Sequence, residues 1–358
     1  MLACSQIKET RIEIFGDKKE KSIQIYQCFL NTNKKIQDLD PERKFSFISQ
    51  PREGTMETSY RGIMGAPVTP FTKDNKIDLE TFERQIDFLI GRGVPMLAHP
   101  MHIGESVSLN REEQKALAKC LIETAAGRVP VFVNVSSAGT DLALELASYC
   151  EKEGATGIVL LPPYHWRPEP KDTINHFMSV GSNIGIKMIA YNNVDAVNIE
   201  ISHNMMGHLI ERLPNFVGLK DASFDMKYFT EACRISSELS PEFSVYTGIE
   251  YLLPSMPVGG AGAFSACAEV APKLTLSHYN ACASMDIEKA RPLQYKVSQL
   301  LNLLMQNYPA TIKYAMELMG RPVGETRKPI PPLSSDAKNH ANERLKSLSI
   351  LENEQTGW

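Results

Sequence analysis

Short apolar runs alternate with longer amphipathic stretches from Arg61 to about residue 271. Eight of these runs are rich in Val, Ile, Leu and Phe and show no alternation of polar and apolar residues. This pattern is typical of strands that are buried on both faces. The eight predicted strands cover residues 62–68, 96–101, 129–135, 157–161, 187–191, 216–219, 243–246 and 262–265.

The stretches between the strands carry the start and stop signals of helices. Three patterns begin after a short polar residue whose side chain can accept a hydrogen bond from the first helical turn, namely Asp78, Asn110 and Thr140. Three patterns are followed by a glycine, which readily adopts the left-handed conformation that ends many helices, namely Gly91, Gly127 and Gly154.

Eight strand–helix units within about 210 residues favour an α/β fold, a (β/α)8 TIM barrel, over an open sheet. After Ala271 the strand signals stop, and the pattern predicts helices at 274–283, 287–305, 311–319 and 336–348. We therefore expect an N-terminal extension at 1–55, a catalytic barrel at 56–272, a C-terminal helical domain at 273–350 and a tail at 351–358.

The first 55 residues are rich in Lys, Glu, Asp and Gln and contain only short apolar patches. Their many acidic residues argue against a transit peptide, and they contain no apolar segment of the kind found in secretion signals. Two interpretations stay open. The segment packs on the domain or on a partner, or it lies upstream of a natural start at Met56.

Composition narrows the class of protein. The net charge of −4 and the pI of about 6.1 give no general affinity for nucleic acid or anionic membranes. No run approaches the ~18 apolar residues of a membrane-spanning helix. The seven cysteines are dispersed without a CxxC pair, which fits a reducing compartment and disfavours zinc, so we expect a cytoplasmic protein.

Lys220 is the first candidate for chemistry, because it ends the apolar run 216–219. Burial lowers the pKa of a lysine, and a neutral amine is a nucleophile. In a barrel, chemistry belongs at the C-terminal ends of the strands. Polar groups at such ends also occur in segments 102–106, 163–167 and 191–193.

These segments, in this order, resemble the Schiff-base aldolase and lyase superfamily of dihydrodipicolinate synthase and N-acetylneuraminate lyase. The similarity extends from about Tyr60 to Leu348. The matching motifs are Gly65-Ala66-Pro67-Val68-Thr69-Pro70-Phe71, Gly104-Glu105-Ser106, Pro162-Pro163-Tyr164, Tyr191-Asn192, Gly218-Leu219-Lys220-Asp221-Ala222, Gly259-Gly260-Ala261-Gly262 and Arg327-Lys328-Pro329-Ile330-Pro331-Pro332-Leu333.

The resemblance implies that Lys220 condenses with the ketone of a 2-oxo acid, most simply pyruvate, to give an imine. Tyr191 matches the tyrosine that moves protons to and from the reacting oxygens, a task that suits a phenol because it both donates and accepts. The turn Gly104, Glu105 and Ser106 matches the one that holds the carboxylate of the 2-oxo acid, largely through backbone N–H groups. Gly262 belongs to a glycine-rich segment that leaves room for substrate beside the lysine.

The sequence departs from the family pattern where proton transfer and carboxylate binding are expected. His102 and Ile103 occupy positions that usually carry small hydroxyl or amide residues. An imidazole donates and accepts protons near neutral pH, whereas Ile103 can offer only its backbone N–H. His165 stands where the synthase has a second tyrosine. We therefore predict that Tyr191, His102 and His165 form a proton relay, and we expect no metal site.

The synthase also has an arginine that binds the carboxylate of its second substrate, and here that position is Ala196. The preceding residue, Asp195, is acidic. A carboxylate without a neighbouring arginine is poorly suited to an anionic semialdehyde, which disfavours the synthase reaction. Ala196 is therefore expected to contact a different second substrate.

From these residues we expect a Schiff-base-dependent aldolase that makes or breaks a C–C bond of pyruvate or a related 2-oxo acid. Three alternatives stay open: a dehydratase of a 2-oxo-3-deoxy sugar acid, dihydrodipicolinate synthase proper, and a non-catalytic ligand-binding homologue. The imine on Lys220 implies that no cofactor is needed. The expected partners are a 2-oxo acid and an aldehyde or sugar acid, and the resemblance also implies a homotetramer.

Overall fold

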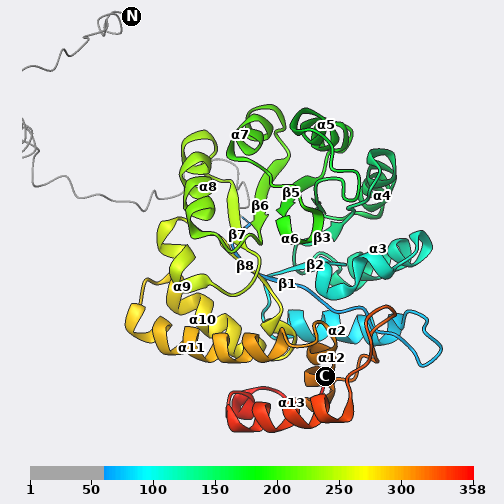
Figure 1. The fold of residues 1–358 in the computed structure, drawn as a ribbon, viewed down its shortest axis with the longest axis vertical. Helices are drawn as coiled ribbons and strands as arrows, with labels where there is room; N and C mark the ends of the chain where they lie inside the picture. Colours follow the sequence, from blue (N-terminus) through cyan, green and yellow to red (C-terminus); the bar gives the residue numbers. More distant parts are fainter. Residues whose placement is uncertain (1–59) are drawn as a thin grey trace, which may run out of the picture. The chain divides into compact units, whose positions relative to one another are not determined.

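The computed structural model describes residues 60–358, so the expected extension 1–55 and the question of Met56 lie outside it. Eight parallel strands close into a barrel in the order β1 to β8 (Figure 1). They are β1 (Gly62–Gly65), β2 (Met96–His99), β3 (Val131–Asn134), β4 (Gly157–Leu160), β5 (Lys187–Asn192), β6 (Phe216–Asp221), β7 (Ser244–Thr247) and β8 (Gly262–Ser265). Each predicted strand is present, and the predicted (β/α)8 fold is confirmed.

Helices surround the barrel and follow its strands in the chain (Figure 1). They are α2 (Leu79–Gly91), α3 (Arg111–Ala125), α4 (Thr140–Glu153), α5 (Pro170–Gly181), α6 (Val194–Val197), α7 (His203–Arg212), α8 (Met226–Leu239) and α9 (Leu252–Ser255). The chain then continues with α10 (Pro272–Ala283), α11 (Ile287–Leu304), α12 (Ala310–Leu318) and α13 (Ser335–Ser347). All four predicted C-terminal helices are therefore present.

Two of the three predicted N-caps are confirmed. The Asp78 side chain accepts a hydrogen bond from the first turn of α2, and Asn110 forms a reciprocal capping box with Glu113 at the start of α3. Thr140 is instead the first residue of α4, whose N-cap is Gly139. The Thr140 hydroxyl lies 2.9 Å from His176 Nδ1, so this side chain joins two neighbouring helices.

The predicted glycine signals at the helix ends are only partly correct. Gly154 is the left-handed C-cap of α4, with φ of 92°. Gly127 is also left-handed but follows Ala126, which is the C-cap of α3. Gly91 is the last residue of α2, and the left-handed residue there is Gly93, so the turn comes two positions later than predicted.

Two apolar cores hold the barrel. One fills the space between the strands and the surrounding helices. The other begins inside the barrel, with Met64, Phe132 and Ile189, and extends into the C-terminal helices through Leu300 and Ile312. Because apolar burial drives this packing, the C-terminal helices are built into the core of the barrel.

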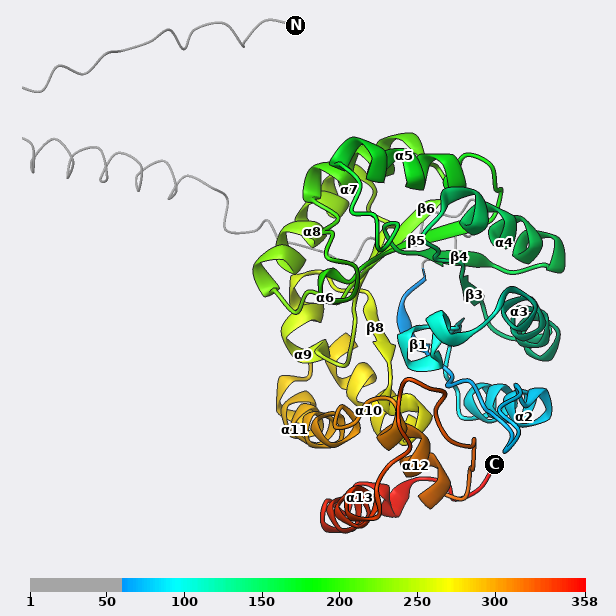
Figure 2. The ribbon, with the colours of Figure 1, turned by 45° about the vertical axis from the view of Figure 1, so that its right-hand side comes forward.

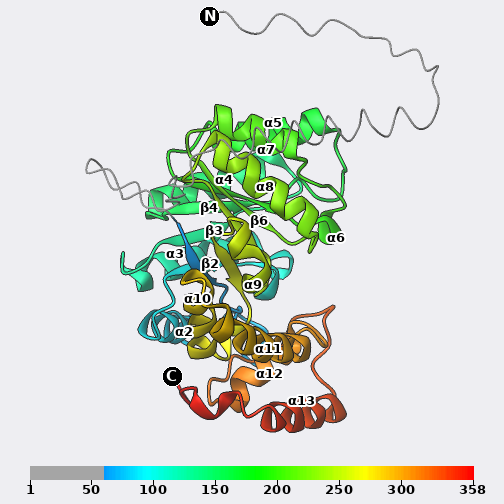
Figure 3. The ribbon, with the colours of Figure 1, turned by 90° about the vertical axis from the view of Figure 1, so that its left-hand side faces the viewer.

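Helices α11, α12 and α13 pack together on one side of the barrel, where α11 lies against α10 (Figures 2 and 3). The last residues are part of this packing. Arg321 is fully buried, and its guanidinium donates to the carbonyls of Gln355, at 2.7 Å, and Val270, at 2.9 Å. Trp358 packs edge-on against Phe88. Residues 60–358 thus lie in one compact unit, in which 273–350 and 351–358 are not separate parts.

None of the helices in the described part of the chain is long and apolar enough to cross a membrane.

Candidate active site

Lys220 and Tyr191 are direct neighbours on adjacent parallel strands, β6 and β5. Both lie near the C-terminal ends of their strands and are almost fully buried, with 4% and 3% of their surfaces exposed. Lys220 Nζ lies 3.7 Å from the centroid of the Tyr191 ring and 4.9 Å from that of Phe264. Strand alternation directs Leu219 toward the surrounding helices, so Lys220 points to the barrel interior.

Burial changes the chemistry of this lysine. Removal from water lowers the pKa of Lys220 from 10.5 to about 7, although the Glu250 carboxylate raises it in part. Glu250 is itself fully buried and accepts hydrogen bonds from the Ser265 hydroxyl and the Cys267 N–H. Near neutral pH a large share of Lys220 is therefore a free amine, which is the nucleophilic form.

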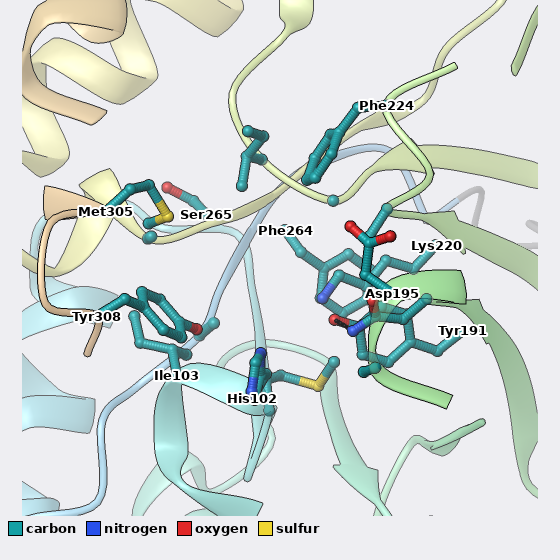
Figure 4. Close-up of a pocket in the computed structure, with 18 residues that line it drawn as sticks. His102, Ile103, Tyr191, Asp195, Lys220, Phe224, Phe264, Ser265, Met305 and Tyr308 are labelled. Carbon is teal, nitrogen blue, oxygen red and sulfur yellow. Dashed lines mark hydrogen bonds between the residues drawn. The ribbon is translucent and has the colours of Figure 1, made fainter. Parts of the chain in front are cut away.

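A cavity of about 410 Å³ opens above Lys220 (Figure 4). Of the predicted site residues, it brings together Lys220, Tyr191, His102, Ile103 and Ala196. The remaining lining is mostly apolar and aromatic. It comes from Ala66, Met101, Asn193, Asp195, Ala222, Phe224, Gly248, Ile249, Phe264, Ser265, Ala266, Met305 and Tyr308.

The Tyr191 hydroxyl accepts a hydrogen bond of 3.0 Å from the Asn193 side-chain amide. Burial raises the pKa of Tyr191 well above its ordinary value, and this hydrogen bond lowers it in part. The phenol therefore keeps its proton in the resting site. With Asn193 donating to its oxygen, that proton remains available to a substrate atom in the cavity.

His102 begins the turn after β2 and lines the cavity on the side facing Tyr308. The surrounding protein removes part of its water, which lowers the pKa of His102, and the charge of Lys220 lowers it further. The ring is therefore mainly neutral at neutral pH, the state in which one nitrogen donates and the other accepts.

The predicted carboxylate cradle differs from the observed turn. The Gly104 and Glu105 N–H groups donate within the turn, to the carbonyls of Met101 and His102 at 2.9 and 3.0 Å. Neither residue lines the cavity, and the Glu105 carboxylate is turned toward Lys313. Gly104 is needed because a Cβ there would lie about 3 Å from the His99 ring. Substrate binding by these two residues is therefore corrected to a structural role.

A second cavity, of about 460 Å³, lies beside the first and shares His102, Tyr191, Asn193 and Ala196 with it. Ser106 and His165 line this second cavity. His165 is exposed, with its ring edge-on to Trp166. The three residues of the predicted relay thus border one space, but His165 does not line the cavity of Lys220.

Gly262 is the first residue of β8 and does not line the cavity above Lys220. It pairs with Gly62 across the closure of the sheet, and a Cβ at Gly262 would lie 1.8 Å from the Gly62 carbonyl oxygen. The glycine is therefore required for the close approach of two strands, and the predicted contact with substrate is corrected.

No pattern in the sequence indicated Tyr308 or Glu250, and no role was assigned to Asn193 within the polar segment 191–193. In the sequence, Tyr308 lies between α11 and α12, more than 40 residues after the last strand. Glu250 lies in the loop that follows β7. Asn193 directly follows the Tyr191-Asn192 motif and was the most accessible of the three to a sequence argument. Among residues 60–358, no three His, Cys, Asp or Glu side chains are grouped so that they could hold a metal ion.

Comparison with known proteins is consistent with this geometry. The model of the dihydrodipicolinate synthetase family matches residues 59–348. A 4-hydroxy-tetrahydrodipicolinate synthase of Archaeoglobus fulgidus is 31% identical over 294 residues, covering 82% of this chain and 99% of the relative. A probable 2-dehydro-3-deoxy-D-pentonate aldolase of Escherichia coli is 31% identical over 297 residues, covering 82% of this chain and 98% of the relative.

Solved structures agree. The prophage protein YagE of Escherichia coli, of the dihydrodipicolinic acid synthase family and crystallised with pyruvate, superposes with a TM-score of 0.79 at 26% identity. The match covers 82% of this chain and 100% of YagE. The resemblance expected from the motifs is thus confirmed. The chain belongs to the dihydrodipicolinate synthetase family and is an enzyme of that family.

Proposed function

We propose that the protein is an aldolase that joins pyruvate, or a related 2-oxo acid, to an aldehyde through an imine on Lys220, and that it catalyses the reverse cleavage. The observation that carries this proposal is the buried Lys220 amine, held against the Tyr191 ring in a cavity large enough for a small substrate. A binding protein has no need for an amine whose pKa burial has brought to about 7.

In the first step the free amine of Lys220 attacks C2 of the 2-oxo acid. The bond from nitrogen to C2 forms and the bond from C2 to oxygen breaks. The former ketone oxygen takes up one proton that the amine nitrogen gives up and a second from an acid, and it leaves as water, so that a protonated imine remains. The proposed proton donor is Tyr191, whose hydroxyl is held by Asn193. Loss of a proton from C3 then gives an enamine, whose electron pair forms a bond to the aldehyde carbon while the aldehyde oxygen takes up a proton. Water then adds to the imine carbon, and the bond from carbon to nitrogen breaks, which releases the product and the free amine of Lys220.

No cofactor is proposed, because the protonated imine itself draws electrons from C3. His102 is proposed to exchange protons with Tyr191, since the two residues line both cavities. His165 stays a prediction. If it belongs to the relay, His165→Phe lowers kcat by at least about tenfold, and full activity of this variant would remove it from the relay.

The cavity favours aldol chemistry over the synthase reaction. Similarity supports both, because the relatives carry both names. Ala196 replaces the arginine expected of the synthase, and Asp195 supplies the one carboxylate among the described residues that line the cavity. Repulsion between Asp195 and a second substrate carboxylate disfavours an anionic semialdehyde. An uncharged, hydroxylated aldehyde fits this wall better, because the Asp195 carboxylate can accept hydrogen bonds from hydroxyl groups.

The reaction is tested with a 2-oxo-3-deoxy sugar acid as substrate. Pyruvate release is followed with lactate dehydrogenase, and the second product is identified by mass spectrometry. Aldol cleavage gives pyruvate and an aldehyde, whereas the dehydratase alternative gives a product that has lost water and releases no pyruvate. Lys220→Arg is the control and is expected to give neither product.

A homotetramer is proposed from the family resemblance. Val107 and Trp166 are 75% and 73% exposed near the second cavity, and apolar side chains this exposed favour contact with another chain. Light scattering after size-exclusion chromatography measures the assembly directly.

A further inference from the structure

Tyr308 brings a phenol into the cavity from outside the barrel. It lies between α11 and α12 and lines the cavity together with Lys220. Figure 4 shows its hydroxyl directed into the cavity, above Ile103 and opposite the side that carries Lys220 and Tyr191. Among residues 60–358 this hydroxyl has no hydrogen-bond partner. The group is therefore available to a ligand in the cavity.

A 2-oxo acid that meets Lys220 brings a carboxylate directly beside the reacting ketone, and this anion needs hydrogen-bond donors. Several polar groups of the lining are already used or unsuitable. The Asn193 amide donates to Tyr191, and the Ser265 hydroxyl donates to Glu250. Asp195, as a carboxylate, only accepts.

Two further groups are reserved for the imine chemistry itself, the Lys220 amine and the Tyr191 proton. Ile103 has no side-chain donor, and the N–H groups of Gly104 and Glu105 are used within the turn. Apart from the ring of His102, the second N–H of the Asn193 amide and main-chain N–H groups, the remaining donor of the described lining is the Tyr308 hydroxyl.

The structure fixes Tyr308 beside the turn that carries Ile103. The Tyr308 and His102 rings are in contact, with centroids 5.4 Å apart. On α12, Lys313 Nζ lies 2.6 Å from the Glu105 carboxylate, and both side chains are at most 2% exposed. Lys313 also donates to the Glu325 carbonyl. This buried ion pair connects the turn after β2, which carries His102 and Ile103, to the segment that carries Tyr308. It therefore holds these two sides of the cavity at a fixed spacing.

Tyr308 also has the right protonation state for binding an anion. Burial raises its pKa well above 10, and the nearby Tyr191 and Glu105 raise it further. The phenol thus keeps its proton at all pH values at which Lys220 reacts. A neutral donor binds a carboxylate without adding a second cation, which would lower the pKa of Lys220 still more.

We propose that Tyr308 binds the carboxylate of the 2-oxo acid through its phenol hydroxyl, beside the main chain of Ile103. The inference rests on the proposed function, because it assigns a role in the same imine-forming site. It makes the C-terminal helices a part of the substrate site, although every residue predicted from the sequence to act there belongs to the barrel.

The test is trapping of the imine at increasing pyruvate concentrations. Borohydride reduces the imine to a stable adduct, and mass spectrometry measures the labelled fraction of wild type and Tyr308→Phe. A hydrogen bond to a charged group stabilises a complex enough that its loss raises the half-saturating pyruvate concentration by about tenfold to about 100-fold. Labelling at saturation is expected to stay complete.

The matched control is Tyr314→Phe, a half-buried tyrosine on α12 that lies outside the cavity. It is expected to bind pyruvate like the wild type. Methyl pyruvate, whose ester carries no charge, is the control ligand and is expected to lose no more than about threefold with Tyr308→Phe. Tyr308→Met is a second variant with the same expected loss for pyruvate, and thermal unfolding verifies that both variants are folded.

An unchanged half-saturating concentration in the folded variants overturns the proposal for Tyr308. Equal losses for pyruvate and for methyl pyruvate also overturn it, because they indicate a general effect on packing. If the wild type itself forms no adduct on Lys220, the proposed function fails instead. The two failures are therefore distinguishable in one experiment.

Discussion

Replacing Lys220 with methionine is expected to abolish imine formation and, at neutral pH, to stabilise the fold. The buried lysine has a pKa of about 7, against 10.5 for an ordinary lysine. Between these two values the unfolded chain binds more protons than the folded chain, so the contribution of Lys220 to stability rises with pH. The loss of stability caused by burying the charged lysine is complete below about pH 7 and absent above about pH 10.5.

The magnitude follows from the two pKa values. At about pH 7 the buried lysine destabilises the fold by roughly 4 kcal/mol, since each pKa unit corresponds to about 1.4 kcal/mol. Methionine removes this penalty and keeps an apolar chain against Tyr191 and Phe264. Lys220→Met is thus expected to gain up to about 4 kcal/mol at about pH 7 and close to nothing at about pH 11.

Urea unfolding at both pH values measures this difference. Lys171→Met is the control, because Lys171 is exposed and its replacement is expected to change the free energy of unfolding by less than about 0.5 kcal/mol. A Lys220→Met variant that is no more stable than the wild type at neutral pH would refute the reasoning. So would a gain of equal size at the two pH values, because it would come from packing and not from the buried charge.

Three further outcomes are expected. The rate of imine formation with pyruvate, measured by rapid-quench trapping, rises about tenfold per pH unit below about pH 7 and is level above about pH 8, because it follows the free amine of Lys220. A rate that still rises about tenfold per pH unit near pH 10 contradicts this. Glu105→Gln lowers the free energy of unfolding by about 3–5 kcal/mol because it leaves Lys313 as an unpaired buried charge. Combining it with Lys313→Met recovers most of this loss in urea unfolding, and an undiminished loss in the double variant argues against the pair. Asp195→Arg raises the kcat/KM for glyoxylate, an anionic aldehyde, relative to that for the uncharged glycolaldehyde by on the order of tenfold, because it replaces repulsion of the anion by attraction. An unchanged ratio of the two kcat/KM values removes Asp195 from the site of the second substrate.

The sequence was sufficient for the barrel and for the pair at its centre. Strands buried on both faces are local apolar runs, and their C-terminal ends are visible as the residues where the runs stop. Lys220 and Tyr191 were found for this reason, and strand pairing brings them together. The departures at Ile103 and Ala196 were equally visible, and both residues line the cavity.

The remaining features depend on contacts between distant parts of the chain. The turn at Gly104 and Glu105 matched a carboxylate-binding pattern, but its N–H groups donate within the turn and the Glu105 carboxylate pairs with Lys313 on α12. Gly262 was assigned to substrate because it belongs to a glycine-rich run, whereas its role arises from strand pairing at the barrel closure. Tyr308 enters the site through packing of the C-terminal helices, which no local pattern predicts.

The central claim is that Lys220 forms a covalent imine with a 2-oxo acid. The most direct measurement is peptide mapping after incubation with pyruvate and borohydride, with Lys220→Arg treated in parallel. We expect one reduced pyruvate adduct per chain, located on Lys220 and absent from the variant. No adduct in the wild type, or an adduct on another lysine that persists in Lys220→Arg, would contradict it.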